Sequence, residues 1–368
     1  MQVVMSYGLG VDSTAILLEW INNPASRDFE LSDLVVLTAM TGVEYDETAR
    51  LVREYILPLL RAHGIRFVQV ARKGRSAKDD GIIVLDDSRN PQELHIDGCY
   101  TLADEMREAA TLPTTGCKRL CSLKGKGYVL DRWINENIEG EFVHVIGFNT
   151  EESKRVAKDQ VYGTAGNRTA SYPLFDWGWD RETCERYIRE TLGVEWRKSC
   201  CTICPYAKRH EAVEYFGDEP ERAGEALALE NVALRFNPRM KLYKTVAAAE
   251  VVADNEQALA AMERELNSKP WAVYEMKRVM LARGGDTAKR GATARQIKMV
   301  SVQLTTRDEA ETEVGGPVQV LRDTGDGRFP RIEVRRVAAP AWVREKQGVS
   351  DKTWNKWWAE AEAVLADS

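Results

Sequence analysis

The stretch that decides the fold lies near the start of the chain and reads Ser6-Tyr7-Gly8-Leu9-Gly10-Val11-Asp12-Ser13-Thr14. It follows a short apolar run at residues 2–5 and precedes a helical pattern at residues 13–21. Glycines let the backbone turn tightly between a strand and a helix, and the N–H groups at the start of a helix attract anions. The hydroxyls of Ser6, Ser13 and Thr14 add further donors. The stretch therefore predicts a phosphate-binding loop.

Two better-known phosphate-binding loops do not match this stretch. A Walker loop has a lysine directly after its last glycine, but here Val11 follows Gly10. A dinucleotide-binding loop has a third glycine where Ser13 stands, and an acidic residue at the end of the second strand, where the chain reads Thr-Ala-Met at residues 38–40. A glycine turn with a serine or aspartate helix cap is the structural alternative.

The sequence around the loop predicts an α/β domain. Strand-like and helical runs alternate through the first half of the chain, at residues 34–39, 48–62, 66–71, 127–137, 142–147 and 180–191. Residues 73–115 have the composition of a polar insertion. Alternation of this kind builds βαβ units. We therefore expect a parallel twisted sheet flanked by helices.

The second half of the chain has a different character. Helical patterns rich in alanine and glutamate come first, at residues 210–232, 245–266 and 271–283. Strand patterns follow at residues 297–304, 318–322 and 332–337, and a last helical pattern at residues 351–365. We therefore expect three regions: a nucleotide-binding domain with a cysteine cluster at residues 1–206, a helical region at 207–284, and a small antiparallel sheet with a tryptophan-rich C-terminal helix at 285–368.

The composition excludes several classes of protein. The chain has 368 residues, of which 44% are hydrophobic and 29% are charged. These values are typical of globular domains and unlike those of disordered or collagen-like chains. No apolar run approaches the ~18 residues of a membrane span, and the N-terminus lacks the pattern of a secretory signal. We therefore expect a cytoplasmic protein without a membrane partner.

The seven cysteines favour metal or redox chemistry, because disulfides are rare in a reducing compartment. Cys117 and Cys121 are separated by three residues, and Cys201 and Cys204 by two. Four thiolates in two such pairs can hold a zinc ion or an iron–sulfur cluster. Cys200 is either an extra thiol or an alternative ligand. Packing cysteines and free redox thiols are the other interpretations.

One stretch is strongly basic in a chain whose net charge is −6. Residues 277–298 contain seven Lys and Arg against one acid, Asp286. Glycines near its middle predict a flexible loop that can follow the phosphate backbone of a nucleic acid, and a solvated linker is the alternative. The tryptophans of the C-terminal region either stack on bases or dock their helix onto a protein surface. These tryptophans are Trp342, Trp354, Trp357 and Trp358.

These motifs together resemble the phosphoadenosine phosphosulfate reductase branch of the adenine nucleotide α-hydrolase superfamily. The loop at residues 6–14 is similar to the pyrophosphate loop of that superfamily. Four further matches follow in order: Thr41-Gly42-Val43-Glu44-Tyr45-Asp46-Glu47-Thr48, Cys121-Ser122-Leu123-Lys124-Gly125-Lys126, residues 147–155, and Tyr172-Pro173-Leu174-Phe175-Asp176-Trp177. Met40 stands where the branch has an acidic residue, and Phe148 and Asn149 depart from its pattern. The resemblance covers about residues 1–210.

The resemblance implies a site for ATP, with the pyrophosphate in the loop and the adenine against the end of the second strand. The implied nucleotide-binding residues are Ser6, Tyr7, Gly8, Leu9, Gly10, Val11, Asp12, Ser13, Thr14, Thr38, Ala39, Met40, Gly147 and Phe148. The implied catalytic residues are Asp12, Ser13, Lys126 and Arg155. Among these, Asp12 is the expected partner of Mg²⁺, and Lys126 and Arg155 are expected, with Lys154, to face the leaving pyrophosphate.

The resemblance also implies a cofactor, a function and partners. It favours a [4Fe-4S] cluster on Cys117, Cys121, Cys201 and Cys204, with zinc as the alternative. Reductases of this branch use a cysteine in a C-terminal tail, and this chain has none after Cys204. The better match is therefore the ATP pyrophosphatase of DNA phosphorothioation systems, a restriction-type modification. Such an enzyme adenylates a DNA backbone phosphate, so that sulfur from a cysteine desulfurase displaces AMP.

Three alternatives stay open at this point. A tRNA thiolase and a sulfate-assimilation enzyme are expected to share the same loop. A non-catalytic nucleotide-binding subunit of a modification complex would keep the loop but have no turnover.

Overall fold

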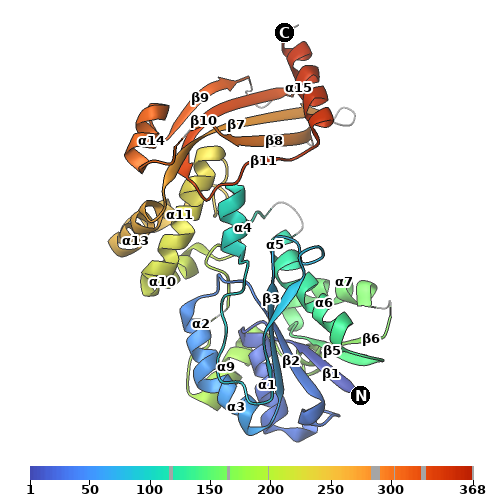
Figure 1. Cartoon of the computed structure of the whole chain (residues 1–368). Coiled ribbons are helices and arrows are strands. Elements are labelled where there is room, and N and C mark those ends of the chain that lie inside the picture. The colour runs from blue at the N-terminus through green and yellow to red at the C-terminus, as the bar shows by residue number, and fades with distance from the viewer. Residues whose placement is uncertain are drawn as a thin grey trace. The chain divides into compact units, whose positions relative to one another are not determined.

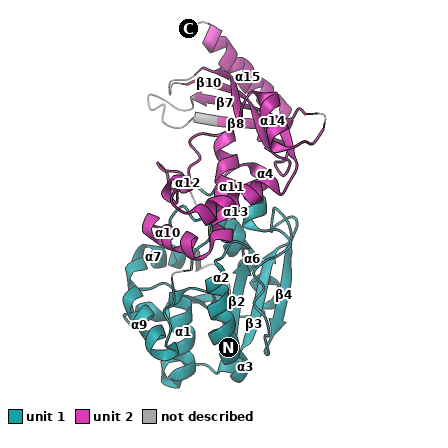
Figure 2. Ribbon diagram, turned by 90° about the vertical axis from the view of Figure 1, so that its left-hand side faces the viewer, with its two compact units in different colours: residues 1–105, 113–207 teal, residues 106–112, 208–368 magenta. Residues whose placement is uncertain are grey.

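The computed structural model describes residues 1–115, 119–163, 166–197, 199–282, 291–301, 303–324 and 329–366. The chain forms two compact units (Figure 2). The first unit contains Met1–Glu105 and Pro113–Ala207, and the second contains Met106–Leu112 and Lys208–Ser368. Each unit has a sheet of its own.

The sheet of the first unit has six strands in the order β4-β3-β2-β1-β5-β6. The strands are β1 (Gln2–Ser6), β2 (Leu34–Met40), β3 (Arg66–Arg72), β4 (Ile82–Ser88), β5 (Phe142–Ile146) and β6 (Arg168–Ser171). All neighbours pair in the parallel sense except β4, which is antiparallel to β3. β1 is therefore a central strand, between β2 and β5. The expected α/β class is confirmed at this level, as a mostly parallel sheet flanked by helices.

Helices cover both faces of this sheet (Figure 1). The helices up to residue 192 are α1 (Val11–Asn22), α2 (Asp46–Leu51), α3 (Leu57–Ala62), α4 (Leu102–Ala109), α5 (Leu120–Ser122), α6 (Tyr128–Asn137), α7 (Ser153–Gly163), α8 (Pro173–Asp176) and α9 (Arg181–Leu192), and the division between the units falls within α4. Successive residues of β1 enter different cores: Met5 packs with α1 and α9, and Val4 packs with α6. Because both faces are buried, the parallel strands are apolar throughout.

The sheet of the second unit is antiparallel and has the strand order β11-β8-β7-β10-β9. The strands are β7 (Trp271–Ala282), β8 (Gly291–Met299), β9 (Val318–Asp323), β10 (Arg331–Pro340) and β11 (Lys346–Gln347). The helices are α10 (Arg209–Asp218), α11 (Pro220–Phe236), α12 (Ala248–Val251), α13 (Glu256–Asn267), α14 (Arg307–Val314) and α15 (Asp351–Ala366). One face of the sheet packs on α11 and α14, and the other packs on α15. The expected small antiparallel sheet is therefore confirmed.

The predicted helix at residues 271–283 is wrong, because this stretch forms strand β7. Tyr274 and Met276 enter one core, whereas Val279 and Leu281 enter the core on the opposite face. Apolar residues on both faces hide the two-residue period of a strand. β7 pairs with both β8 and β10, so the regions expected at 207–284 and 285–368 share one sheet and one compact unit.

Several elements were missing from the sequence-based prediction, among them β4, β6, α4, α7 and α14. β4 lies at an edge of the sheet, inside the stretch that we expected to be a polar insertion. Its residues are half-buried or exposed, and Asp86, Asp87 and Ser88 end it. An edge strand of this kind has no continuous apolar run from which it can be recognised.

The C-terminal helix α15 docks onto its own unit. Trp354 is buried in the core between α15 and the sheet, and it stacks on Trp358 with the ring centroids 5.5 Å apart. Of the two roles considered for these tryptophans, docking is the one that the structure shows. No helix in the described ranges is long and apolar enough to cross a membrane.

Candidate functional site

The glycine loop lies at the carboxyl end of the central strand. β1 ends at Ser6, and α1 begins at Val11. The neighbouring strands β2 and β5 lead directly into Thr41 and Gly147 at the same edge of the sheet. A methyl carbon added to Gly147 would lie 3.1 Å from the backbone nitrogen of Ser13, so this glycine packs against the first turn of α1. In open α/β sheets, ligands bind at this carboxyl edge.

The first turn of α1 has no side-chain cap. Gly10 precedes the helix, and no side chain in the described part of the chain accepts a capping hydrogen bond there. The hydroxyl of Ser13 instead donates to the Gly10 carbonyl at 3.1 Å. The first N–H groups of a helix have no partners within the helix, and they attract an anion. The serine or aspartate cap of the structural alternative is therefore not formed among the described residues.

Two residues far along the chain hold the loop in shape. Leu9 has a left-handed backbone, with φ at 61°, and its carbonyl accepts from Trp196 Nε1 at 3.2 Å. Ser199 Oγ donates to the Gly8 carbonyl at 3.3 Å. A methyl carbon on Gly10 would lie 2.6 Å from Ser199 Oγ, so a larger residue there would displace the hydroxyl that donates to Gly8.

A cavity of about 640 Å³ opens beside the loop. The loop contributes Ser6, Gly8, Gly10, Val11, Asp12 and Ser13 to its lining. Four cationic residues line it as well, namely Arg119, Lys126, Arg155 and Arg181. So do four cysteines, namely Cys121, Cys200, Cys201 and Cys204. The structure therefore brings most of the loop, two predicted cations and three predicted metal-ligand cysteines to one cavity within the first unit.

Some predicted nucleotide-binding residues lie inside the protein instead. Tyr7, Leu9 and Thr14 are buried, and the Tyr7 hydroxyl lies 3.1 Å from Thr14 Oγ1. Residues 38–40, the expected adenine contacts, are buried within β2 and are not among the residues that line the cavity. The next residue, Thr41, does line it. Gly147 and Phe148 line it as expected.

Asp12 has two partners that the motif does not reveal. Its Oδ2 pairs with Arg181 at 2.9 Å, and its Oδ1 accepts from Asn149 Nδ2 at 3.3 Å. Burial raises the pKa of Asp12, and the charge of Arg181 opposes that shift. Arg181 is the first residue of α9 and adds a cation that the sequence-based prediction missed. Both oxygens of the expected magnesium ligand are thus already engaged by protein groups.

Lys126 is paired with a buried acid beside the cysteines. Its Nζ lies 2.9 Å from Glu44 Oε1, and the same oxygen lies 3.9 Å from Cys201 Sγ. Glu44 is 3% exposed, and its Oε2 has no hydrogen-bond partner among the described residues. Burial disfavours the charged ammonium, but the negative charge and the hydrogen bond of Glu44 oppose burial, and the pKa of Lys126 is raised. Lys126 is therefore the partner of Glu44 as well as a cation that lines the cavity.

Arg155 lies over an aromatic ring. Its guanidinium carbon is 4.3 Å from the ring centroid of Phe148, and it also pairs with Glu152. Phe148 stacks on Tyr172, with centroids 5.9 Å apart and the ring planes 12° from parallel. A cation on a ring is held by the ring's quadrupole, so this stack orients Arg155 at the cavity wall. Lys154 is exposed and is not among the lining residues.

The four cysteines that line the cavity are half-buried. Burial raises the pKa of the Cys121 thiol, and burial together with Glu44 holds the pKa of Cys201 well above its usual value. Cys117 lies outside the described residues. Within the described part of the chain, no three His, Cys, Asp or Glu side chains are arranged to hold a metal ion. The thiols are the right kind of donor for a cluster or zinc, but the described set is not a complete metal site.

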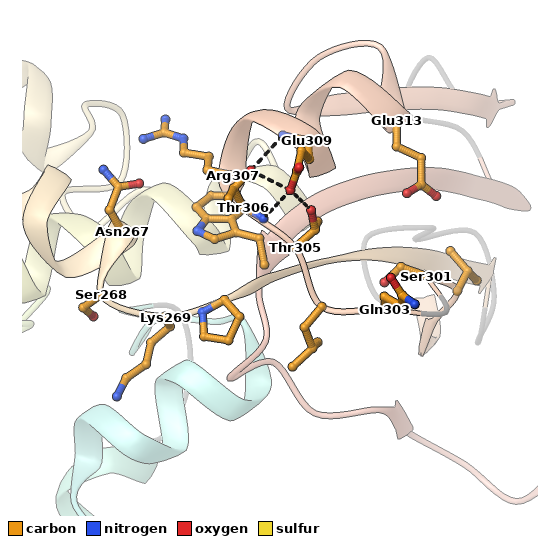
Figure 3. A pocket seen from close by; sticks show the side chains of 14 residues that line it. Asn267, Ser268, Lys269, Ser301, Gln303, Thr305, Thr306, Arg307, Glu309 and Glu313 are labelled. Carbon is orange, nitrogen blue, oxygen red and sulfur yellow. Dashed lines mark hydrogen bonds between the residues drawn. The ribbon is translucent and has the colours of Figure 1, made fainter.

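A larger cavity, of about 1130 Å³, lies in the second unit (Figure 3). Three of its lining residues, Thr306, Arg307 and Glu309, are engaged in hydrogen bonds or ion pairs within the unit. Glu309 Oε2 accepts from the N–H of Thr306 at 3.0 Å and from its hydroxyl at 2.9 Å, which completes the cap of α14. Arg307 pairs with Glu263 at 2.5 Å and with Glu311 at 3.0 Å. The cap of α14 and the ion pairs of Arg307 therefore occupy part of the wall of this cavity.

The basic stretch at residues 277–298 is not a flexible loop where the structure describes it. Arg278 lies in β7 and pairs with Glu333 at 3.0 Å. Arg295 lies in β8 and donates to a backbone carbonyl of the same unit at 2.6 Å. Residues 283–290, the centre of the expected loop, lie outside the described residues. A nucleic-acid interface there remains a prediction.

Comparison with models of known protein families gives no match to this chain, and comparison with curated proteins gives none either. Its function is therefore inferred from the geometry of the cavity and from the resemblance of its motifs.

Proposed function

We propose that the first unit binds ATP at loop residues 6–14 and transfers the adenylyl group to an acceptor, with release of pyrophosphate. The observation that carries this proposal is the uncapped first turn of α1, which opens into a cavity lined by four cationic side chains. Helix N-termini and guanidinium groups both bind phosphate oxygens well. A cavity of about 640 Å³ is of the size that small-molecule ligands occupy.

We also propose that the first unit has the adenine nucleotide α-hydrolase fold. Its mostly parallel sheet carries the glycine loop after a central strand and has helices on both faces. The five ordered motifs support the same assignment. Four of them, at residues 6–14, 41–48, 121–126 and 147–155, contribute residues to the lining of the cavity.

In the proposed reaction, an acceptor oxygen attacks the α-phosphorus of ATP, and the bond from that phosphorus to the bridging oxygen of pyrophosphate breaks. Negative charge builds up on the leaving group, so donors and cations beside the loop lower the barrier. Arg181 is suited to this role because Asp12 holds it at 2.9 Å beside the first turn of α1. ATP enters such reactions as its magnesium complex, in which the ion neutralises further charge.

The thiols support sulfur as the second reactant. Cys121, Cys200, Cys201 and Cys204 share the cavity with the loop. Adenylation turns an acceptor oxygen into part of a good leaving group, AMP, which a sulfur nucleophile can displace. From the resemblance, the proposed acceptor is a DNA backbone phosphate, and the proposed sulfur source is a cysteine desulfurase. A [4Fe-4S] cluster on the cysteines belongs to the same proposal.

Pyrophosphate release from MgATP, measured with duplex DNA or with tRNA, tests this function. We expect duplex DNA to stimulate release by the full chain, and Arg181→Gln to lower the stimulated rate by about tenfold or more. Arg264→Gln removes an exposed arginine of the second unit and is the matched control. Stimulation by tRNA alone would contradict the DNA acceptor and favour a tRNA thiolase. Binding of ATP without pyrophosphate release on either nucleic acid would favour the non-catalytic subunit.

A further inference from the structure

A chain of four side-chain hydrogen bonds runs across the first unit to the start of the glycine loop. The Tyr172 hydroxyl donates to Asp159 Oδ2 at 2.8 Å. Arg168 donates to the same oxygen at 2.7 Å, and its Nε donates to His144 Nδ1 at 2.7 Å. His144 Nε2 lies 2.8 Å from Ser6 Oγ. The chain therefore connects β6 and β5 to the last residue of β1, where the loop begins.

The partners of His144 determine where its proton lies. A guanidinium N–H can only donate, so the Nδ1 that faces Arg168 must accept. His144 is 6% exposed, and burial together with the charge of Arg168 lowers its pKa to about 4. The ring is therefore neutral at pH 7 and has a single proton, which lies on Nε2. The hydrogen bond to Ser6 Oγ is donated by His144.

This direction decides what Ser6 offers to the cavity. A hydroxyl has one hydrogen and two lone pairs, and Ser6 Oγ accepts from His144 through one of those lone pairs. Its own hydrogen is then left to donate to another acceptor, and Ser6 lines the cavity beside the loop. With the opposite tautomer, Ser6 would donate to Nε2 and present only lone pairs, which repel an anion.

We propose that His144 is a positioning residue that commits the Ser6 hydroxyl to donate to an anionic oxygen bound at the loop. The inference rests on the proposed function, in which that oxygen belongs to the triphosphate of ATP. Arg168 sets the tautomer of His144, and Asp159 and Tyr172 hold Arg168 in place. His144 itself needs no contact with the nucleotide.

The tautomer can be measured without any ligand, by ¹⁵N NMR of the histidine side chains of the full chain at pH 7. The chain has only four histidines, so the spectrum of His144→Asn assigns the signal. We expect a protonated Nε2 and an unprotonated Nδ1. A proton on Nδ1 overturns the inference, whatever the protein does with ATP.

Equilibrium binding of ATP tests the second half of the inference. His144→Asn keeps a polar group near Arg168 but removes the donor to Ser6, whereas His144→Gln places an amide N–H near the position of Nε2. We expect His144→Asn and Ser6→Ala each to weaken ATP binding by about tenfold, and the double variant to be no weaker than either single variant. His144→Gln should recover part of the loss.

If the hydrogen bonds of His144 only stabilise the sheet, a different result is expected. His144→Asn would then lower the unfolding temperature, and ATP binding by the folded protein would stay unchanged. That outcome overturns the inference. Fully additive losses in the double variant overturn it too. His63→Asn makes the same change at an exposed position of the same unit and is the control. If the wild-type protein has the Nε2–H tautomer but binds no ATP, the proposed function is contradicted. The inference that Ser6 donates to a phosphate oxygen of ATP is then contradicted as well.

Discussion

Lys126→Met removes the cation that faces Glu44 but keeps most of the bulk of the side chain. In the wild-type protein, Lys126 Nζ lies 2.9 Å from Glu44 Oε1. The second oxygen of Glu44 has no hydrogen-bond partner among the described residues, so the lysine is its main compensation. After the substitution, a buried acid is left beside Cys201 without its cation. We therefore expect a large loss of stability from one substitution at the wall of the site.

The magnitude follows from the distance and the burial of the pair. At an effective dielectric constant of about 20, unit charges this close attract by roughly 5 to 6 kcal/mol. The Glu44 side chain is 4% exposed, but that of Lys126 is 32% exposed, so water screens part of the attraction. Removing one partner of a buried pair typically costs about 3–5 kcal/mol. We expect the lower end of this range, about 3 kcal/mol.

Urea unfolding of four proteins measures this coupling. The four are the wild type, Lys126→Met, Glu44→Gln and the double variant. In the double variant, a neutral amide replaces the Glu44 carboxylate that Lys126→Met leaves without its cation. We therefore expect the double variant to be more stable than Lys126→Met by about 2 kcal/mol. Lys154→Met changes an exposed lysine of the same unit and should stay within about 0.5 kcal/mol of the wild type.

Two results would refute this reasoning. One is a Lys126→Met protein as stable as the wild type. The other is a double variant whose loss equals the sum of the two single losses. If the stability of the double variant recovers while pyrophosphate release does not, Lys126 acts on the nucleotide in addition to balancing Glu44.

Three further predictions concern pH, the loop and the cysteines. Lowering the pH from 6.5 to about 4 should decrease the free energy of unfolding by about 3 kcal/mol through His144. The pKa of His144 is lowered to about 4 in the folded protein, so over this range the unfolded chain binds a proton that the folded protein does not. Urea unfolding at several pH values should show this slope in the wild type, and His144→Gln should flatten it; an unchanged slope would contradict the pKa. Gly147→Ala adds a methyl carbon 3.1 Å from the Ser13 nitrogen and should weaken ATP binding about tenfold. Gly217→Ala, which meets nothing within 4 Å, is its control, and equal affinities of the two variants would count against the role of the first turn. Protein prepared without oxygen should contain iron and sulfide that Cys121→Ser and Cys204→Ser lose but the exposed-site variant Cys99→Ser keeps. Zinc in place of iron would select the alternative metal, and metal-free protein would contradict both.

The fold of the first unit was predictable where the pattern is local. β1, β2, β3 and β5 are short apolar runs, because helices bury both faces of the sheet. Their alternation with helices indicated a parallel sheet. The apolar pattern did not identify β7 as a strand, because the two faces of β7 enter different cores of the second unit. There, twelve residues of mixed apolar and charged type fit a helix as well as a strand.

The loop of the candidate site was predictable, but most of its partners were not. Residues 6–14 combine glycines and hydroxyls in adjacent positions, so their chemistry is visible in the sequence. Asn149 lies 137 positions from Asp12, and His144 lies 138 positions from Ser6. Asn149 falls within the motif at residues 147–155, but the sequence does not pair it with Asp12, nor His144 with Ser6. The pairing of β1 with β5 brings these residues to the loop. The only feature of the sequence that pointed to Arg181 as a site residue was its position at the start of a predicted helix.

Calorimetric titration of the full chain with ATP in the presence of magnesium is the most direct test of the central claim, that the uncapped first turn of α1 holds a triphosphate. We predict saturable binding to one site per chain, weakened about tenfold by Gly147→Ala and unchanged by Gly217→Ala. A titration that shows no binding of ATP or of a non-hydrolysable analogue by the folded wild-type protein would contradict it.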